Sequence, residues 1–237
     1  MAKSRSILDI NGTFQGMTFV KSNVYGDHLR APRGTHKPAE LNEAFQQSSS
    51  RLIHANLAAK IVKDALEPYR ENFKGGLLWQ RLLSQFRKQL KNIGEIDFSA
   101  LEPVEVHDKY PLSRFLRVTP KTEYDADKRE LHIQLNYGQH PRPRHMKYMD
   151  GYRISVIGIF PDLEQKTAMT SDIGSPVIKL SSPYEKLDLI LPVPPEATAY
   201  ILCVKVEAYT GSEICNQTLN KGMRIESAGK IASSFEP

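Results

Sequence analysis

The residues best suited to chemistry lie in the stretch YGQHPRPRHMKYMDGY, where two histidines and an aspartate could meet a metal ion. They are His140, His145 and Asp150. Prolines separate the two histidines, so neither a helix nor a strand aligns their rings. We therefore expect no metal site and interpret the stretch as an exposed basic loop between two strands. Contact with an anion or a nucleic acid is the alternative that its basic residues leave open.

Paired carboxylates, the other candidates for chemistry, occur as Asp125 and Asp127 in EYDADKRE. Aspartates in turns bond their own backbone more often than they perform acid–base chemistry, so we predict a hairpin turn here. The sequence contains no P-loop, dinucleotide-binding fingerprint, nucleophile elbow, HExxH or CxxC motif. We therefore expect a protein that is not an enzyme and that has no catalytic residue and no cofactor.

The composition is that of a chain that folds and does not enter a membrane. Its 237 residues are 40% hydrophobic and 25% charged, close to the globular average. No apolar run approaches the roughly 18 residues that span a bilayer, and the basic N-terminus lacks the apolar core of a secretory signal. We expect a cytoplasmic protein, or one that becomes part of an assembled particle. Cys203 and Cys215 are expected to be buried free thiols, with a single bridge as the alternative.

The net charge of +5 divides unevenly along the chain. Residues 1–92 carry 15 Lys/Arg and 7 Asp/Glu, a balance of +8, whereas residues 93–237 carry 17 and 20, a balance of −3. A basic half beside an acidic half is typical of nucleic-acid contact. It is equally typical of self-association in which a basic segment lies on the acidic body of another copy. The charge count leaves both open.

Residues 1–38 are predicted to form a basic, strand-forming arm. In NGTFQGMTFVKSNVYGDHLRAPRGTHKP, Asn11-Gly12 is a turn signal, and the aromatic and β-branched residues that follow favour short strands. Beyond Tyr25 the segment becomes polar and basic, and Pro32 and Pro38 prevent a helix from crossing it.

Residues 39–98 are predicted to form a helical hairpin. The first helix has an apolar stripe at steps of four and three residues, made of Leu41, Phe45, Ser48, Leu52, Ala55, Ala59, Val62 and Leu66. Pro68 should end this helix near Leu66, and Gly94 should cap the second one. The apolar face of the second helix is Phe73, Trp79, Leu82, Leu83, Phe86 and Leu90. Both stripes fit burial in the protein's own core, and binding of another subunit along part of them is the alternative.

Residues 99–237 are predicted to be β structure, so the fold class is α+β. RELHIQLNY and TAYILCVKVEAY alternate as strands do, and about seven strands, counting one near residues 114–119, predict a β-sandwich. The last hairpin, AYILCVKVEAYTGSEICNQT, resembles that of fibronectin-type or immunoglobulin-like sandwiches. This likeness concerns the fold and not the function.

The apolar residues of the arm must be buried on the chain's own body or on another copy, because a hairpin alone is marginal in water. Arms that add a strand to a neighbour's sheet form main-chain hydrogen bonds, and the edges of a sandwich can receive them. Head-to-tail donation of this kind builds rings or filaments. The predicted interface residues are the anchors Phe14, Met17, Phe19 and Val20, with Arg30 and Arg33 in contact with an acidic neighbour.

Three segments, GTFQGMTFVKS, GDHLRAPRG and the helix opening AELNEAFQQSS, together resemble the N-terminus of uncharacterised proteins of Bacteroidetes bacteria and their phages. In those proteins a Gly-x-Leu/Phe-x-Gly core precedes an Arg-Gly segment and a helix. The likeness covers about residues 10–60, and the matching residues are Gly12, Phe14, Gly16, Phe19, Arg30 and Gly34. The family has no assigned activity, so the resemblance implies no catalytic residue. Some members are phage-associated, which implies a structural role.

These observations together predict a non-enzymatic assembly protein that forms homo-oligomers through arm exchange, as a ring, a filament or a component of a phage-like particle. Its expected partners are further copies of itself and other structural proteins, with no membrane partner. Nucleic-acid association through the basic first 92 residues is the alternative, and strongly salt-dependent binding would be its mark.

Overall fold

A computed structural model of the chain describes residues 12–14, 17–20, 28–30, 42–70, 77–107, 111–114, 116–138, 140, 149–183, 186–215 and 221–231. The chain forms two compact units, Met1–Gln46 and Gln47–Pro237. The first contains the predicted arm and ends eight residues beyond the predicted boundary at residue 38. The second holds both the helical hairpin and the sheets, so the boundary predicted near residue 98 falls inside one compact unit.

The arm carries a small antiparallel sheet. Its strands are β1 (Gly12–Phe14), β2 (Met17–Val20) and β3 (His28–Arg30), in the order β1-β2-β3. The register pairs Phe14 with Met17 and Phe19 with Leu29. The short strands that the sequence predicts in the arm are therefore present, and they pair with one another in a sheet of their own.

The helical hairpin is confirmed, and both helices end where the sequence predicts. Its helices are α1 (Glu43–Leu66), the 3-10 helix η1 (Glu67–Tyr69) and α2 (Leu78–Asn92). The side-chain oxygen of Asn42 accepts a hydrogen bond from the backbone N–H of Phe45 (2.9 Å), which caps the start of α1. Pro68 stands just beyond Leu66. After α2, Gly94 has a φ of 90°, the left-handed conformation that glycine adopts at helix ends.

Two antiparallel sheets follow the helices. The smaller has the order β10-β6-β5, and the larger has the order β4-β13-β11-β7-β8, with β12 paired to β11 and β9 to β7. The strands are β4 (Val104–Glu105), β5 (Val118–Asp125), β6 (Glu130–Tyr137), β7 (Gly151–Asp162), β8 (Thr167–Gly174), β9 (Ile178–Lys179), β10 (Leu187–Pro192), β11 (Ala199–Thr210), β12 (Glu213–Ile214) and β13 (Lys221–Lys230). Short 3-10 helices lie at Phe98–Ala100 (η2) and Leu112–Arg114 (η3).

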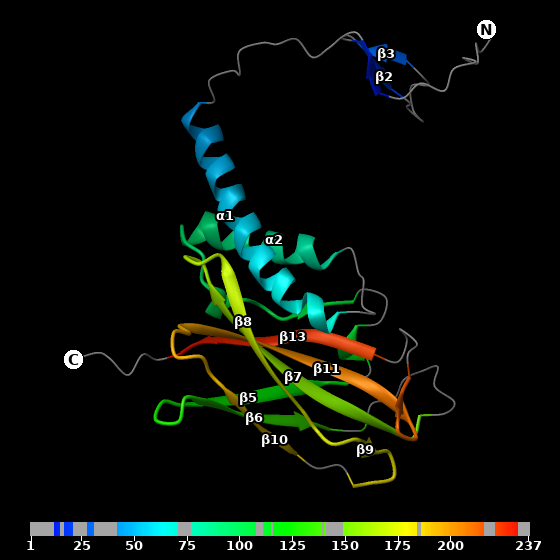
Figure 1. Cartoon of the computed structure of the whole chain (residues 1–237). Helices are drawn as coiled ribbons and strands as arrows, with labels where there is room; N and C mark the ends of the chain where they lie inside the picture. The colour runs from blue at the N-terminus through cyan, green and yellow to red at the C-terminus, as the bar shows by residue number, and fades with distance from the viewer. Residues whose placement is uncertain are drawn as a thin grey trace, which may run out of the picture. The chain divides into compact units, whose positions relative to one another are not determined.

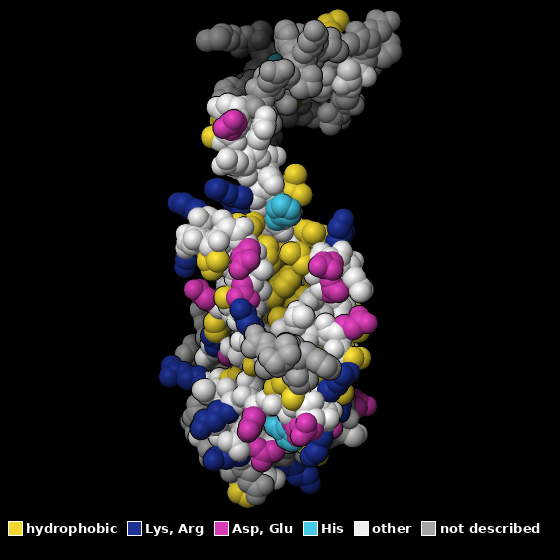
Figure 2. All heavy atoms as spheres, turned by 90° about the vertical axis from the view of Figure 1, so that its left-hand side faces the viewer, with side chains coloured by type: hydrophobic (Ala, Val, Ile, Leu, Met, Phe, Trp, Pro, Cys, Tyr) yellow, Lys and Arg dark blue, Asp and Glu magenta, His cyan; other side chains and the backbone are white. Residues whose placement is uncertain are grey.

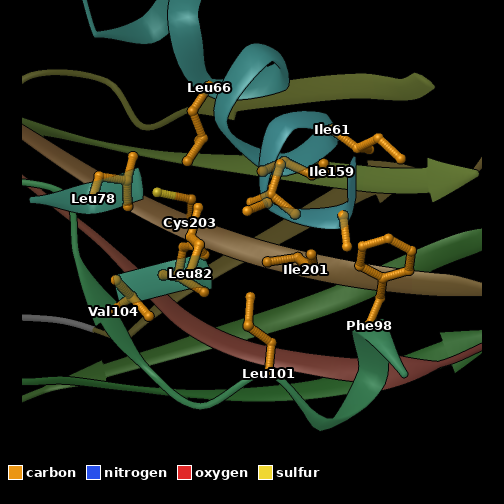
Figure 3. Close-up of a cluster of buried hydrophobic side chains, with 14 of the residues drawn as sticks. Ile61, Leu66, Leu78, Leu82, Phe98, Leu101, Val104, Ile159, Ile201 and Cys203 are labelled. Atoms are coloured by element: carbon orange, nitrogen blue, oxygen red, sulfur yellow. The ribbon is translucent and has the colours of Figure 1, made fainter. Parts of the chain in front are cut away.

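The second unit has three layers, with the larger sheet in the middle (Figure 1). One face of this sheet packs on the smaller sheet, and the core between them includes Leu131 and Ile133 of β6 with Ile154 and Val156 of β7. The other face packs on the helices (Figure 3), where Ile159 and Ile201 meet Ile61, Leu66 and Leu82. This explains why β7 and β11 are apolar on both faces, whereas β6 alternates between buried and half-buried residues.

Burial explains most of the two helical stripes. Ala55, Ala59, Val62 and Leu66 of α1 are buried, as are Leu82, Phe86 and Leu90 of α2. Alanines at the contact let α1 approach the sheet closely. Phe73, predicted on the second stripe, lies outside the described residues. The N-terminal part of the α1 stripe is exposed, which leaves the subunit-binding alternative open for that part.

One predicted strand begins later than the sequence pattern suggested. A strand was expected near residues 114–119, but Leu112–Arg114 is a 3-10 helix and β5 begins only at Val118. The physical reason is a long-range cap. The Glu105 carboxylate accepts hydrogen bonds from the backbone N–H groups of Leu112 (2.8 Å) and Ser113 (3.1 Å). These bonds favour a helical turn that local sequence patterns do not reveal.

Candidate interaction surfaces

His140 has a structural role. Its Nε2 donates to the carbonyl oxygen of Ser182 (2.9 Å), which leaves Nδ1 to accept from the hydroxyl of Tyr152 (2.8 Å). Burial first, and then the neighbouring Tyr137, raises the pKa of Tyr152, so its hydroxyl keeps the proton that this bond needs. Both ring nitrogens of His140 are thus occupied, one in holding the chain after β6 to β7 and the other in holding it to the loop between β9 and β10.

The remaining candidates for chemistry do not converge. His145 lies outside the described residues, and Asp150 accepts a hydrogen bond from the backbone N–H of Gly211 (2.7 Å). Within the described part of the chain, no three His, Cys, Asp or Glu side chains are close enough together to hold a metal ion. Asp125 accepts from the backbone N–H groups of Asp127 and Lys128, both at 3.1 Å, so the predicted hairpin turn is confirmed.

The arm sheet presents an apolar face. Met17 and Phe19 alternate along β2 on one side, and the register sets Leu29 of β3 opposite Phe19. Met17 is 51% exposed and Leu29 is 57% exposed, while Phe19 is half-buried. We call Met17, Phe19 and Leu29 the arm face. Leu29 was not among the predicted anchors, although its place between His28 and Arg30 has the alternation of a strand.

The other predicted arm residues are distributed as follows. The register places Phe14 opposite Met17, and Val20, half-buried, opposite His28 on the other side of the sheet from Phe19. Arg30 pairs with Thr18 through the backbone. Arg33 lies outside the described residues.

The N-terminal half of α1 exposes a second apolar surface. Phe45 is 64% and Leu52 41% exposed, seven residues apart and therefore on one side of the helix, and Ile53, 63% exposed, lies on the adjoining side. Every residue from Glu43 to His54 is exposed, whereas the following turns are buried against the larger sheet. We call Phe45, Leu52 and Ile53 the α1 strip. The apolar stripe that the sequence predicts along this helix is therefore exposed from Phe45 to Leu52 and buried in the core from Ala55.

A groove of about 570 Å³ separates α1 from α2. Its lining residues are Ser48, Arg51, Leu52, Gln80, Leu83, Ser84, Arg87, Lys88 and Lys91. All four cationic side chains are exposed, and Lys88 forms an ion pair with Glu102 at the surface (3.7 Å). Figure 2 shows Lys and Arg side chains around the helical layer, with hydrophobic side chains exposed between them. The basic run at residues 87, 88 and 91 was visible in the sequence. That Arg51 of α1 faces this run was not.

A buried carboxylate lies at an irregularity of the larger sheet. The pairing of β11 with β13 shifts register between Leu202 and Cys203, which leaves Glu226 as an extra residue on β13. The Glu226 carboxylate pairs with Arg224 (3.6 Å), and Arg224 also pairs with Glu105 (3.6 Å). Burial raises the pKa of Glu226 to about 7; Arg224 opposes this shift and Glu105 adds to it.

No protein-family model matches the chain, and no curated protein matches it in sequence. Among solved structures, the first C2 domain of human synaptotagmin XIII is similar at 15% identity and a TM-score of 0.26. The match covers 41% of this chain and 65% of that domain, which is less than two thirds of its length. A structural similarity this low gives no information on function. In the described residues, no helix combines the length and the apolar character needed to cross a bilayer.

Proposed function

We propose that this protein is a non-enzymatic assembly protein whose N-terminal arm joins it to further copies of itself. The observation that carries the proposal is the arm face. A three-stranded sheet this short is marginal in water, and here two of its apolar side chains, Met17 and Leu29, are more than half exposed. Covering this face by a neighbouring molecule would stabilise the sheet and the association together.

The α1 strip supports the same proposal from a second element. Its three apolar side chains lie on a helix whose following turns are already buried, so the strip extends a packing surface beyond the protein's own core. An exposed helical strip of this kind is a common docking surface for another helix or subunit.

The edges of the sheets differ in how well they could receive an arm strand. β5 and β10, the edges of the smaller sheet, contain Pro120 and Pro192, which cannot donate to an added strand. β8 forms one edge of the larger sheet over eight residues and contains no proline. Arm exchange would therefore use β8 as its receiving edge.

We also propose that the two packed sheets belong to the fibronectin-type class of sandwich. The support is the strand order. The first, second and fifth of the seven longer described strands form β10-β6-β5, and the remaining four form β13-β11-β7-β8. Sandwiches of this class serve many functions, so the assignment concerns architecture alone.

The resemblance of the N-terminus to phage-associated proteins suggests a phage-like particle as the setting, with other structural proteins as further partners. Deletion of residues 1–38 tests the role of the arm, because the body is a compact unit of its own. The truncated protein should keep the circular dichroism and cooperative melting of the body and lose the oligomers that the full chain forms. Normal assembly of the truncated protein would refute the proposal.

A further inference from the structure

Seven of the nine residues that line the groove between α1 and α2 carry hydrogen-bond donors at the ends of their side chains, and their apolar stems line the groove together with two leucines. Four of the seven carry a positive charge, and the leucines are Leu52 and Leu83. No aspartate or glutamate of the described chain lines it. Such a surface is complementary to a ligand rich in negatively charged oxygen atoms.

The cations are close together and on facing helices. Arg87, Lys88 and Lys91 occupy neighbouring positions on α2, and Arg51 lies across the groove on α1. Lys91 lies three residues beyond Lys88 and four beyond Arg87, spacings at which like charges on a helix repel one another, and the exposed Lys88–Glu102 pair at 3.7 Å offsets little of this repulsion. An anion in the groove would relieve the repulsion, so the arrangement favours a bound polyanion over an empty groove.

We propose that this groove binds the sugar-phosphate backbone of a nucleic acid. Arginine matches phosphate with two parallel N–H donors, and the serine and glutamine side chains add neutral donors. Among the described residues no aromatic side chain lines the groove, so these residues contact the backbone without stacking on bases or reading sequence.

An acidic amphipathic helix of a partner protein fits less well. Such helices insert several apolar anchors between apolar side chains, and only two of the nine lining residues, Leu52 and Leu83, are apolar. The charge distribution within the second unit also favours a polyanion. All four cations fall in residues 47–92, which carry nine Lys/Arg and three Asp/Glu, a balance of +6, whereas residues 93–237 have a balance of −3. The inference is independent of arm exchange.

The salt dependence of binding gives a quantitative expectation. Each neutralised phosphate contributes a slope of about −0.7 to −0.9 to the plot of log K against log salt concentration. Four neutralised phosphates therefore predict a slope of about −3. At 0.1 M salt, removing one of the four cations should weaken binding roughly five- to eightfold.

The test uses the full chain and fluorescence anisotropy with labelled 20-nucleotide single-stranded and double-stranded DNA and with a labelled poly-glutamate peptide. Arg51→Gln, Arg87→Gln and Lys91→Gln are combined in one variant. All three side chains are exposed, so the fold should survive, and a thermal melt checks this. The matched control removes three exposed charges elsewhere, as Lys121→Gln, Lys179→Gln and Lys186→Gln combined.

We expect saturable binding of DNA that is independent of sequence, a slope near −3 that falls towards −1 in the triple variant, and an affinity loss of about 100-fold or more at 0.1 M salt. The control variant should lose far less. No binding at low salt, or equal losses in the triple and control variants, would overturn the proposal. Tighter binding of poly-glutamate than of either DNA would also overturn it and would identify the groove as a site for acidic peptides.

Discussion

Phe19 of β2 lies directly opposite Leu29 of β3, so the two residues share one side of the arm sheet with Met17. This cross-strand pair turns a short, basic segment into a surface with an apolar face. The body has its own core on both sides of the larger sheet, so it does not need the arm in order to fold. This separation is why we propose that the arm contacts another copy.

The α1 strip should contribute to self-association without contributing to the stability of the body. Replacing Phe45 and Ile53 together by glutamine removes two exposed apolar side chains and adds no charge near the groove. We expect weaker oligomers in sedimentation velocity and a melting temperature close to that of the unchanged protein. An unchanged oligomer distribution would exclude the strip from the interface. A large fall in melting temperature would show that the strip is part of the core.

Glu226 should make the protein less stable as the pH rises from about 4.5 to about 7. Its pKa is raised to about 7 in the folded state, so over this range the folded protein holds a proton that the unfolded chain has lost. A shift of this size corresponds to roughly 3 kcal/mol of unfolding free energy, present below pH 4.5 and lost above pH 7. Glu226→Gln should flatten this dependence and raise the stability at pH 8. Urea unfolding at several pH values across this range measures the unfolding free energy. If it changes with pH equally in the variant and in the unchanged protein, Glu226 is not the group responsible.

The two thiols should differ in reactivity. Cys203 is buried, and burial first, with the charges of Glu226 and Glu105, raises the pKa of its thiol. Cys215 is half-buried beside the hydroxyl of Thr210 (2.9 Å). A thiol reagent should label Cys215 rapidly in the native protein and Cys203 only when the protein unfolds. Cys215→Ser should abolish the fast phase, and rapid labelling of that variant would show that Cys203 is accessible.

Gly229 should not tolerate a side chain. A Cβ atom there would lie 2.6 Å from the ring carbon that carries the Tyr200 hydroxyl, and this hydroxyl bonds to Thr122 (2.8 Å). Gly229→Ala should therefore lower the unfolding free energy by about 1–3 kcal/mol, the usual cost of overpacking. Gly138→Ala is the matched control, because no atom lies within 4 Å of a Cβ built there. Equal stability of the two variants in denaturant titration would contradict the packing of Tyr200.

The sequence predicted correctly those features that depend on residues close together in the chain. Pro68 and Gly94 marked the ends of the two helices, and the alternation of residues 131–137 marked β6. The cap on η3 was not predictable, because it comes from Glu105 across an intervening stretch of chain. The stripe from Leu41 to Leu66 could not reveal where its burial stops, since that depends on how far the larger sheet extends beneath α1.

The candidate surfaces were predicted only in part. Met17 and Phe19 were recognisable as apolar residues outside the core, but Leu29 joins them only through the pairing of β3 with β2. The groove needs Arg51 to face Arg87 and Lys91 across two helices, an arrangement that depends on the turn between them. Charge asymmetry indicated a basic region, and only the fold concentrates these side chains in one place.

The most direct test of arm-mediated assembly is light scattering on a sizing column over a range of concentrations and at low and high salt. It compares the full chain with a Met17→Gln, Leu29→Gln variant and with Thr13→Gln on the opposite side of the sheet. The account predicts that the full chain and the Thr13 variant form particles well above the 26.8 kDa of one copy, and that the double variant shifts towards that mass. A full chain that stays at 26.8 kDa under all conditions, or a double variant that assembles like the full chain, would contradict it.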